Sequence, residues 1–319
     1  MEKVTKKPGL LAALLTAAAG LAGIAVWPFL LIAGGLFGYL LTAGGFVPFA
    51  LSGVIFAGVA FLWQNTNGLL IVALVLPAAV CMGIMMRKKA AYFDIAFACA
   101  AICTGAFYLI CSLPDLISGS PAFYTLQQNW DTFIRNFVSA FSQGPYQAPP
   151  EQLAIWEQLG RELSVELVIY MPAIICTVGA MMGLTNLLFC KRLCRLANAP
   201  IKPMRPFLLW QLPQSFLYGM LTMAAGTFIA FELNVFAIDS VIPAVYVIAA
   251  IPFAIQGLCV LWFTQHARRS GMGSLMFLLI LLLFTFPLSV LSLAIVGLVE
   301  QLFHLRRRYL QRGNGENND

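Results

Sequence analysis

The sequence is poor in charged residues, and this shortage excludes a soluble globular protein. No charged side chain occurs between Pro8 and Met86. Charged residues form 10% of the chain, against roughly 25% in soluble domains. Such a stretch offers no polar face to water, whereas a bilayer core needs roughly 20 apolar residues per helical crossing. We therefore expect an integral membrane protein whose first partner is the lipid bilayer.

Motifs of catalysis and nucleotide binding are missing as well. The two histidines, His266 and His304, stand near arginines, without a serine, cysteine or carboxylate at catalytic spacing. No Gly-rich phosphate loop occurs, so the chain lacks the usual means of binding and hydrolysing ATP. We expect a protein that is not an enzyme and that needs no cofactor.

The eight cysteines show neither the spacing of a metal site nor a secreted disulfide framework. All but Cys194 lie inside apolar runs or at their ends, where cysteine behaves as a small hydrophobic residue. Cys190 and Cys194 are one helical turn apart and would hold a metal only if other ligands converged. We expect no metal site.

The net charge of +6 reflects membrane topology rather than nucleic-acid binding. Of the 19 Lys and Arg residues, 13 fall in four short clusters beside apolar runs, as is typical of the cytoplasmic side of a membrane. The clusters are Lys3, Lys6 and Lys7; Arg87, Lys88 and Lys89; Lys191, Arg192, Arg195, Lys202 and Arg205; and Arg268 and Arg269.

The apolar runs predict an all-α polytopic transmembrane bundle of about eight or nine spans. The breaks among the first three runs are weak, marked only by Trp27-Pro28 and Gly44-Gly45, so the early count is open by one. The predicted spans cover residues 9–26, 28–44, 46–64, 68–86, 92–113, 163–190, 207–231, 239–264 and 274–300.

These spans place all four basic clusters, and the N-terminus, on the cytoplasmic side of the membrane. The connections 114–162 and 232–239 then face outside. Nine crossings would also put the basic tail outside, against the same rule. A broken helix near Pro287, one early span fewer, or an exception to the rule would each resolve this conflict, and we favour a cytoplasmic tail.

The expected organisation has four parts. Residues 1–113 form a five-span half, 114–162 an outer connection, 163–305 the remaining spans, and 306–319 a basic and then disordered tail. The tail is basic through Arg306, Arg307, Arg308 and Arg312.

The connection 114–162 carries an aromatic stripe at helical spacing. This pattern predicts an amphipathic helix along the outer membrane surface or capping the bundle, as a filler between span ends or as a lid over a substrate. Pro150 begins a second short helix, to about Gly160. The stripe consists of Phe123, Leu126, Trp130, Phe133, Phe137 and Phe141, and the opposite face of Gln127, Gln128, Asp131 and Asn136.

Polar residues near the predicted span ends are the candidate substrate contacts, because few polar groups enter this bilayer region. Each has a structural alternative: an interfacial carboxylate, a polar turn, or hydrogen bonding between helices, the last applying also to Asn186. The candidates are Gln64, Asn67, Glu166, Tyr170, Glu232, Asn234, Asp239 and Gln256.

The first span also carries two small-x-x-x-small pairs, Ala13 with Ala17 and Ala18 with Ala22. This spacing allows a second helix backbone to approach closely. The partner is either another helix of the same bundle or a separate protein.

The chain resembles the YybS-like family of bacterial multi-pass membrane proteins, whose function is unknown. The likeness is carried by NLLFCKRLCRLANAP from Asn186, RPFLLWQLP from Arg205, IQGLCVLWF from Ile255, and LPAAVCMGIMMRKK from Leu76. It continues to Gly297, Glu300 and Arg306-Arg307, with Glu300 where the family usually has Asp.

The first six spans of that family are similar in layout to the substrate-capture subunits of energy-coupling-factor vitamin transporters. That resemblance implies capture of a vitamin or small metabolite, and docking of a transmembrane coupling protein on Ala13, Ala17, Ala18 and Ala22, with separate ATPases. The chain has three more spans than such subunits, and no ligand motif matches residue by residue. The leading hypothesis is therefore a transport-related protein, and the alternative is a non-catalytic envelope scaffold or assembly factor.

Overall fold

The computed structural model describes residues 9–25, 29–143, 148–203, 209–233, 238–267 and 288–306. Every regular element within these ranges is a helix, and six helices are long and apolar enough to cross a bilayer. The predicted all-α polytopic bundle is confirmed. The six are α3, α4, α5, α7, α8 and residues Val241–His266 of α9, while α1, the continuous α2–η2 and α11 are apolar but shorter.

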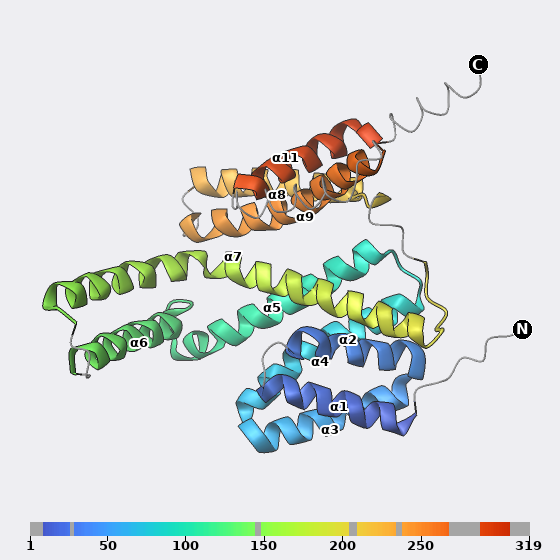
Figure 1. Cartoon of the computed structure of the whole chain (residues 1–319), viewed down its shortest axis with the longest axis horizontal. Coiled ribbons are helices and arrows are strands. Elements are labelled where there is room, and N and C mark those ends of the chain that lie inside the picture. The colour runs from blue at the N-terminus through green and yellow to red at the C-terminus, as the bar shows by residue number, and fades with distance from the viewer. Residues whose placement is uncertain are drawn as a thin grey trace, which may run out of the picture. The chain divides into compact units, whose positions relative to one another are not determined.

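The chain divides between Lys202 and Pro203 into two compact units. Unit 1 contains α1 (Leu10–Ala25), α2 (Leu30–Tyr39), the π-helix η2 (Leu40–Gly44), α3 (Phe46–Gln64), α4 (Thr66–Arg87), α5 (Tyr92–Ser118), α6 (Tyr124–Gln143) and α7 (Pro150–Leu196). Unit 2 contains α8 (Gln214–Glu232), α9 (Ile238–Ala267) and α11 (Leu288–Phe303). Figure 1 shows these elements in chain order from blue to red.

The core of unit 1 forms where α1, α2, α3 and α4 pack together. Phe37 of α2 lies at its centre, with its ring 5.4 Å from that of Phe56 and 6.3 Å from that of Phe49 on α3. Gly20 of α1 lies directly against the Phe56 and Phe37 rings, so its lack of a side chain lets α1 approach them. α7 then packs along both α2 and α5.

The weak break at Gly44-Gly45 has a structural explanation. α2 ends in the single π-turn of η2, and the backbone N–H of Gly45 donates to the Leu40 carbonyl oxygen at 3.1 Å. Gly45 has a φ of 100°, a conformation that residues with a Cβ rarely adopt. The chain therefore turns between two helices without any charged residue to mark the turn.

α7 differs from the prediction of a short helix ending near Gly160 followed by a separate span from residue 163. It is one helix of 47 residues, about 70 Å long at 1.5 Å per residue. Gly160 does not end it, because its backbone faces Ile134 of α6 and its carbonyl oxygen accepts a hydrogen bond from Trp130 Nε1 at 3.2 Å. This packing offsets the weak helix preference of one glycine.

α5 also extends beyond its predicted end at residue 113, to Ser118, and its last turn fixes the start of α6. Gly119, with a φ of 70°, ends α5. The fully buried Asp115 accepts hydrogen bonds from the backbone N–H of Thr125 at 2.9 Å and from the Thr125 hydroxyl. A carboxylate at this position caps a helix N-terminus, so α6 is held in a defined direction. α6 then runs back along α7, and the two form a hairpin extending away from α1–α4 (Figure 1).

Most other predicted spans correspond to observed helices. The runs 46–64 and 68–86 match α3 and α4, and 239–264 matches α9. The run 207–231 begins its helix only at Gln214, after Pro213. Of the run 274–300 only the part from Leu288 is described. Lys3, Lys6, Lys7, Arg205, Arg268, Arg269 and the tail after Arg306 lie outside the described residues.

Unit 2 depends on a close crossing of α9 and α11. A Cβ added to Gly257 would clash with the Leu293 carbonyl oxygen, and one added to Gly297 with the Phe253 carbonyl oxygen. The two helix backbones therefore touch at these glycines. Such contacts provide the van der Waals packing that holds helices together in lipid.

We predict that Gly297→Ala separates α9 from α11 and lowers the stability of unit 2 by about 1–3 kcal/mol or more, because the methyl group has no space. Thermal unfolding of the purified protein in detergent measures this effect. Gly226→Ala on α8 is the matched control, since nothing lies within 4 Å of an added Cβ there. Equal melting temperatures of the two variants would contradict the described crossing.

Candidate functional site

The predicted substrate residues are dispersed over both units. Gln64 is half-buried and Asn67, Glu166, Tyr170 and Glu232 are exposed. Asn234 lies outside the described residues, as does the side chain of Asp239, whose backbone is in the first turn of α9. Gln256 is buried. No hydrogen bond among the described residues joins any two of these candidates.

Four of the candidates lie far along the chain from the basic ends of α4 and α7. The Sγ of Cys190 and the Sδ of Met86 are 3.4 Å apart, so the basic ends of α7 and α4 lie side by side. Asn67 precedes Met86, and Tyr170 precedes Cys190, by about 20 residues, or about 30 Å of helix. Asn67, with its neighbour Gln64, therefore lies at the other end of α4, whereas Tyr170 and Glu166 lie near the middle of the long helix α7.

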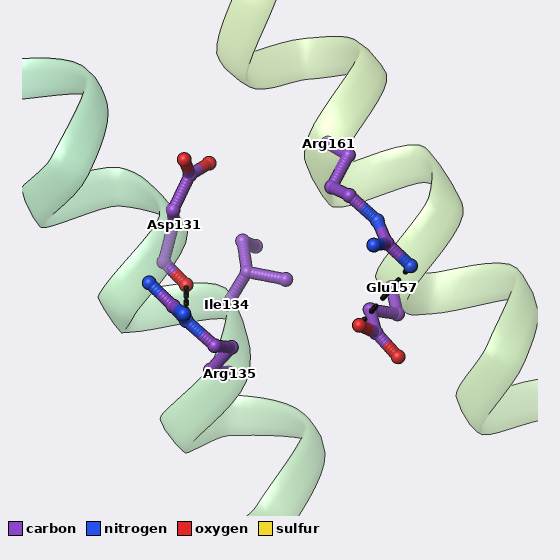
Figure 2. Close-up of a pocket in the computed structure, with 5 residues that line it drawn as sticks. All are labelled: Asp131, Ile134, Arg135, Glu157 and Arg161. Carbon is purple, nitrogen blue, oxygen red and sulfur yellow. Dashed lines mark hydrogen bonds and ion pairs between the residues drawn. The ribbon is translucent and has the colours of Figure 1, made fainter.

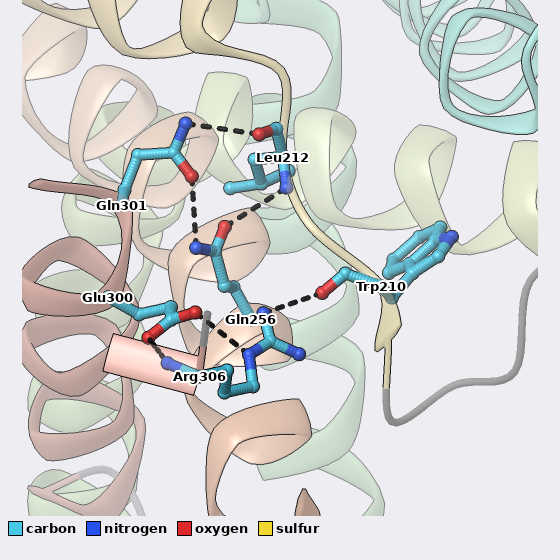
Figure 3. Close-up of polar contacts among 6 residues, drawn as sticks. All are labelled: Trp210, Leu212, Gln256, Glu300, Gln301 and Arg306. Carbon is cyan, nitrogen blue, oxygen red and sulfur yellow. Dashed lines mark hydrogen bonds and ion pairs between the residues drawn. The ribbon is translucent and has the colours of Figure 1, made fainter. Parts of the chain in front are cut away.

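A closed polar network forms in unit 2 around Gln256 (Figure 3). The Gln256 Oε1 accepts a hydrogen bond from the Leu212 backbone N–H at 3.2 Å, and its Nε2 donates to Gln301 Oε1 at 2.9 Å. The Gln301 Nε2 donates in turn to the Leu212 carbonyl oxygen at 3.0 Å. These two amides bind both polar groups of one backbone residue and each other.

A buried ion pair lies beside these amides. Arg306 Nε is 2.9 Å from Glu300 Oε1, and the two side chains are only 4% and 1% exposed. The Arg306 guanidinium also donates to the Trp210 carbonyl oxygen at 2.8 Å. Arg306, predicted as the first residue of a basic tail, is thus inside unit 2, because its charge is paired there with Glu300.

The network holds the stretch 209–213 against α9 and α11. Lipid provides no hydrogen-bond partners, so buried amides and charges must satisfy one another. The side-chain amide of Gln256 forms hydrogen bonds with Gln301 and Leu212. This agrees with the predicted alternative in which Gln256 hydrogen-bonds between helices rather than to a substrate. The two amides and the ion pair are satisfied by one another and by backbone groups, so the geometry of the network is that of a structural clamp.

A small cavity lies between α6 and α7, with a volume of about 170 Å³. Its lining residues are Asp131, Ile134 and Arg135 of α6, and Glu157 and Arg161 of α7 (Figure 2). Arg161 Nη2 is 3.1 Å from Glu157 Oε1, but both side chains are largely exposed. The cavity is small compared with the roughly 300–1,000 Å³ of typical ligand pockets and is lined mainly by solvated charges. We find no metal-binding group of three or more His, Cys, Asp or Glu within the described ranges.

The two alanine pairs of α1 are not equivalent. Ala13 and Ala17 are buried against the unit's own helices, so they are not available to a separate protein. Ala18 is exposed and Ala22 is half-buried, on the side of α1 that also exposes Leu11 and Leu15. Only the second pair can contact a partner without displacing a helix of unit 1.

Asn186 joins α7 to α2 in a similar way. Its Oδ1 accepts a hydrogen bond from the Gly35 backbone N–H at 2.8 Å, and its side chain lies against Gly34. The side chain is 2% exposed; its Oδ1 is used in this interhelical contact, whereas its Nδ2 has no hydrogen-bond partner within the described part of the chain.

Sequence reasoning missed Gln301 and the pairing of Glu300 with Arg306. A usable signal was present, since Glu300 and Gln301 interrupt the end of an apolar run that must find polar partners. It also missed Gly179 and Gly183 of α7, which contact Thr104 and Ala100 of α5. Their four-residue spacing is the small-x-x-x-small signal that was recognised only in α1.

A family model described as "Predicted membrane protein (DUF2232)" matches residues 10–300. The chain belongs to this family. The "Uncharacterized protein YybS" of Bacillus subtilis (strain 168) is 24% identical to it over 260 residues, which cover 80% of this chain and 81% of that protein. The predicted membership of a YybS-like family is confirmed. No solved structure matches this DUF2232 protein.

For this DUF2232 member we predict that Glu300→Gln lowers the free energy of unfolding by about 3–5 kcal/mol, because it leaves the buried Arg306 charge without its counter-ion. The change is measured by chemical denaturation in detergent. Glu157→Gln removes one partner of the exposed pair with Arg161 and should cost about 1 kcal/mol or less. Equal effects of the two substitutions would contradict the buried pairing.

Proposed function

We propose that this protein is the membrane-embedded capture component of a transport system. It binds a small metabolite or vitamin, depends on a separate ATPase partner for energy, and is not itself an enzyme. It lies in the bacterial cytoplasmic membrane with its N-terminus in the cytoplasm, an orientation that the basic clusters support.

The observation that carries the proposal is the composition of unit 1. Six apolar helices, α1, α2 with η2, α3, α4, α5 and α7, pack into one unit that ends at Lys202, and the last four are long enough to cross a bilayer. Six is the number of spans in the substrate-capture subunits that the sequence resembles in layout. The candidate residues Gln64, Asn67, Glu166 and Tyr170 all lie away from the basic ends of α4 and α7, which supports ligand capture from the side opposite the basic clusters.

The need for a partner follows from the missing nucleotide motif. The exposed side of α1 supports docking of this partner, because the small side chains of Ala18 and Ala22 allow another helix to approach α1 closely. Ala13 and Ala17 do not contribute to that surface, since they are already buried in unit 1.

The first experiment is purification of the protein from its native membrane in mild detergent. Mass spectrometry identifies bound small molecules and co-purifying ATPases. We expect a single small metabolite and an ATPase module in repeated preparations. Recovery of neither would refute the proposal.

A substitution tests the docking surface directly. Ala18→Leu should reduce the recovered ATPase at least roughly tenfold, which corresponds to about 1.4 kcal/mol of lost binding energy. Its melting temperature should stay near that of the wild type, because Ala18 is exposed. Gly58→Leu on α3 is the control for added bulk on an exposed helix, since nothing lies within 4 Å of an added Cβ. Unchanged ATPase recovery with Ala18→Leu would place the docking surface elsewhere.

A non-catalytic scaffold or assembly factor is the second candidate. The observation in its favour is the α6–α7 hairpin, which extends away from α1–α4 and exposes large apolar side chains. Deletion of residues 121–142 should then abolish contact with another envelope protein and leave uptake unchanged. A loss of uptake with intact protein contacts would favour transport instead.

A further inference from the structure

The α6–α7 hairpin has two different sides. Each helix carries a row of large apolar side chains at intervals of four residues, and every member is at least 39% exposed. The rows are Phe133, Phe137 and Phe141 on α6, and Ile155, Leu159 and Leu163 on α7.

Ring contacts place these two rows on the same side of the hairpin. The centroid of the Trp156 ring is 5.7 Å from that of Phe137 and 5.4 Å from that of Phe141. Trp156 lies on the same face of α7 as Leu159 and Leu163, because residues three and seven positions apart share a helix face. The two rows and Trp156 thus form one surface, which we call the apolar side.

Four of the seven charged residues between 124 and 166 occupy the other side. Asp131 and Arg135 of α6 lie opposite Glu157 and Arg161 of α7 around the cavity (Figure 2). The hairpin is therefore amphipathic as a pair of helices, and its charged side can remain in water while its apolar side is covered.

The apolar side continues into the membrane-spanning part of α7. Beyond Leu163, the exposed apolar side chains Ile174, Met181 and Leu188 follow on the same helix face at spacings of 11, seven and seven residues. Glu162 and Glu166, both exposed, border this face three residues beyond Leu159 and Leu163, and Tyr170, an aromatic residue suited to the membrane–water interface, follows them. The row therefore passes from the hairpin into the spanning part through a short interfacial stretch, where the two carboxylates can reach the headgroups and water.

The shape of α7 allows the hairpin to reach the membrane surface. A helix of about 70 Å is too long to end at the bilayer if it crosses upright, because the hydrocarbon core is about 30 Å thick. Pro172 lies inside α7, and the helix changes direction part-way along (Figure 1). A proline removes one backbone hydrogen bond and permits such a bend.

The net charge of the hairpin narrows the type of membrane surface that it can bind. Residues 124–166 contain five acidic and two basic residues, a net charge of −3. Attraction to anionic headgroups would need the opposite sign. The aromatic rings at the centre of the apolar side instead suit the boundary between headgroups and acyl chains, which they enter without a charge partner.

We propose that the apolar side of the α6–α7 hairpin is seated in the membrane interface and binds a lipid surface with zwitterionic headgroups. α6 and the first part of α7 then lie along the bilayer, with Asp131, Arg135, Glu157 and Arg161 facing water. This inference does not depend on the proposed transport function.

Photo-crosslinking of the full-length protein in phosphatidylcholine vesicles tests the proposal. The photoreactive residue p-benzoylphenylalanine replaces Phe137 or Leu159 on the apolar side, and Arg135 or Arg161 on the charged side as matched controls. After irradiation, mass spectrometry counts lipid adducts at each position. We expect several-fold more lipid adducts at Phe137 and Leu159 than at the two control positions.

Other products would overturn the proposal. Crosslinks to residues 203–319 would mean that unit 2 covers the apolar side, and crosslinked dimers would mean a second copy. Crosslinks to another protein in native membranes, equal lipid yields on both sides, or no adduct at any position would also refute it.

Replacing half of the phosphatidylcholine by phosphatidylglycerol should not raise the yield of lipid adducts at Phe137, and a rise would refute the preference for zwitterionic lipid. Crosslinking results are counted only for variants that elute like the wild-type protein. Each probe replaces an exposed side chain, so normal folding of the variants is expected.

Discussion

The lack of hydrogen-bond partners in lipid is the constraint on which the structure depends. Each polar group that enters the bundle must be satisfied by another part of the protein. Gln256 and Gln301 meet this requirement by binding both polar groups of Leu212, and Glu300 and Arg306 meet it by pairing. The few polar residues of this apolar chain therefore decide which helices and connections lie together.

Close approach of backbones is the second consequence of a lipid environment. Apolar side chains gain little by leaving lipid for a helix interface, so association relies on small residues and van der Waals contact. Gly257 and Gly297 hold α9 to α11, while Gly179 and Gly183 hold α7 to α5. The buried pair Ala13 and Ala17 serves α1 in the same way, which leaves Ala18 and Ala22 for contacts outside unit 1.

These constraints separate three surfaces by role. The unit 2 network is satisfied internally and has the properties of a structural clamp. Asn67 and Tyr170 of unit 1 are exposed polar and aromatic residues, which the proposed capture of a ligand would use. The α6–α7 hairpin presents an apolar side and a charged side, and the Asp115 cap fixes its direction at the first turn of α6. Capture, docking and membrane contact would thus involve different residues.

The sequence by itself determined the membrane environment and the helical fold, because an uncharged stretch from Pro8 to Met86 can be accommodated only as helices in a bilayer. It also determined the family. It also predicted α3 and α4 closely, since apolar length sets the ends of spans. Only the tertiary structure decided that α7 continues through Gly160, that Arg306 is buried and that Ala17 and Ala18 have different neighbours. Each of these depends on residues distant in the chain, such as Ile134 facing Gly160 or Trp210 binding Arg306, and periodicity within one helix contains no information about such neighbours.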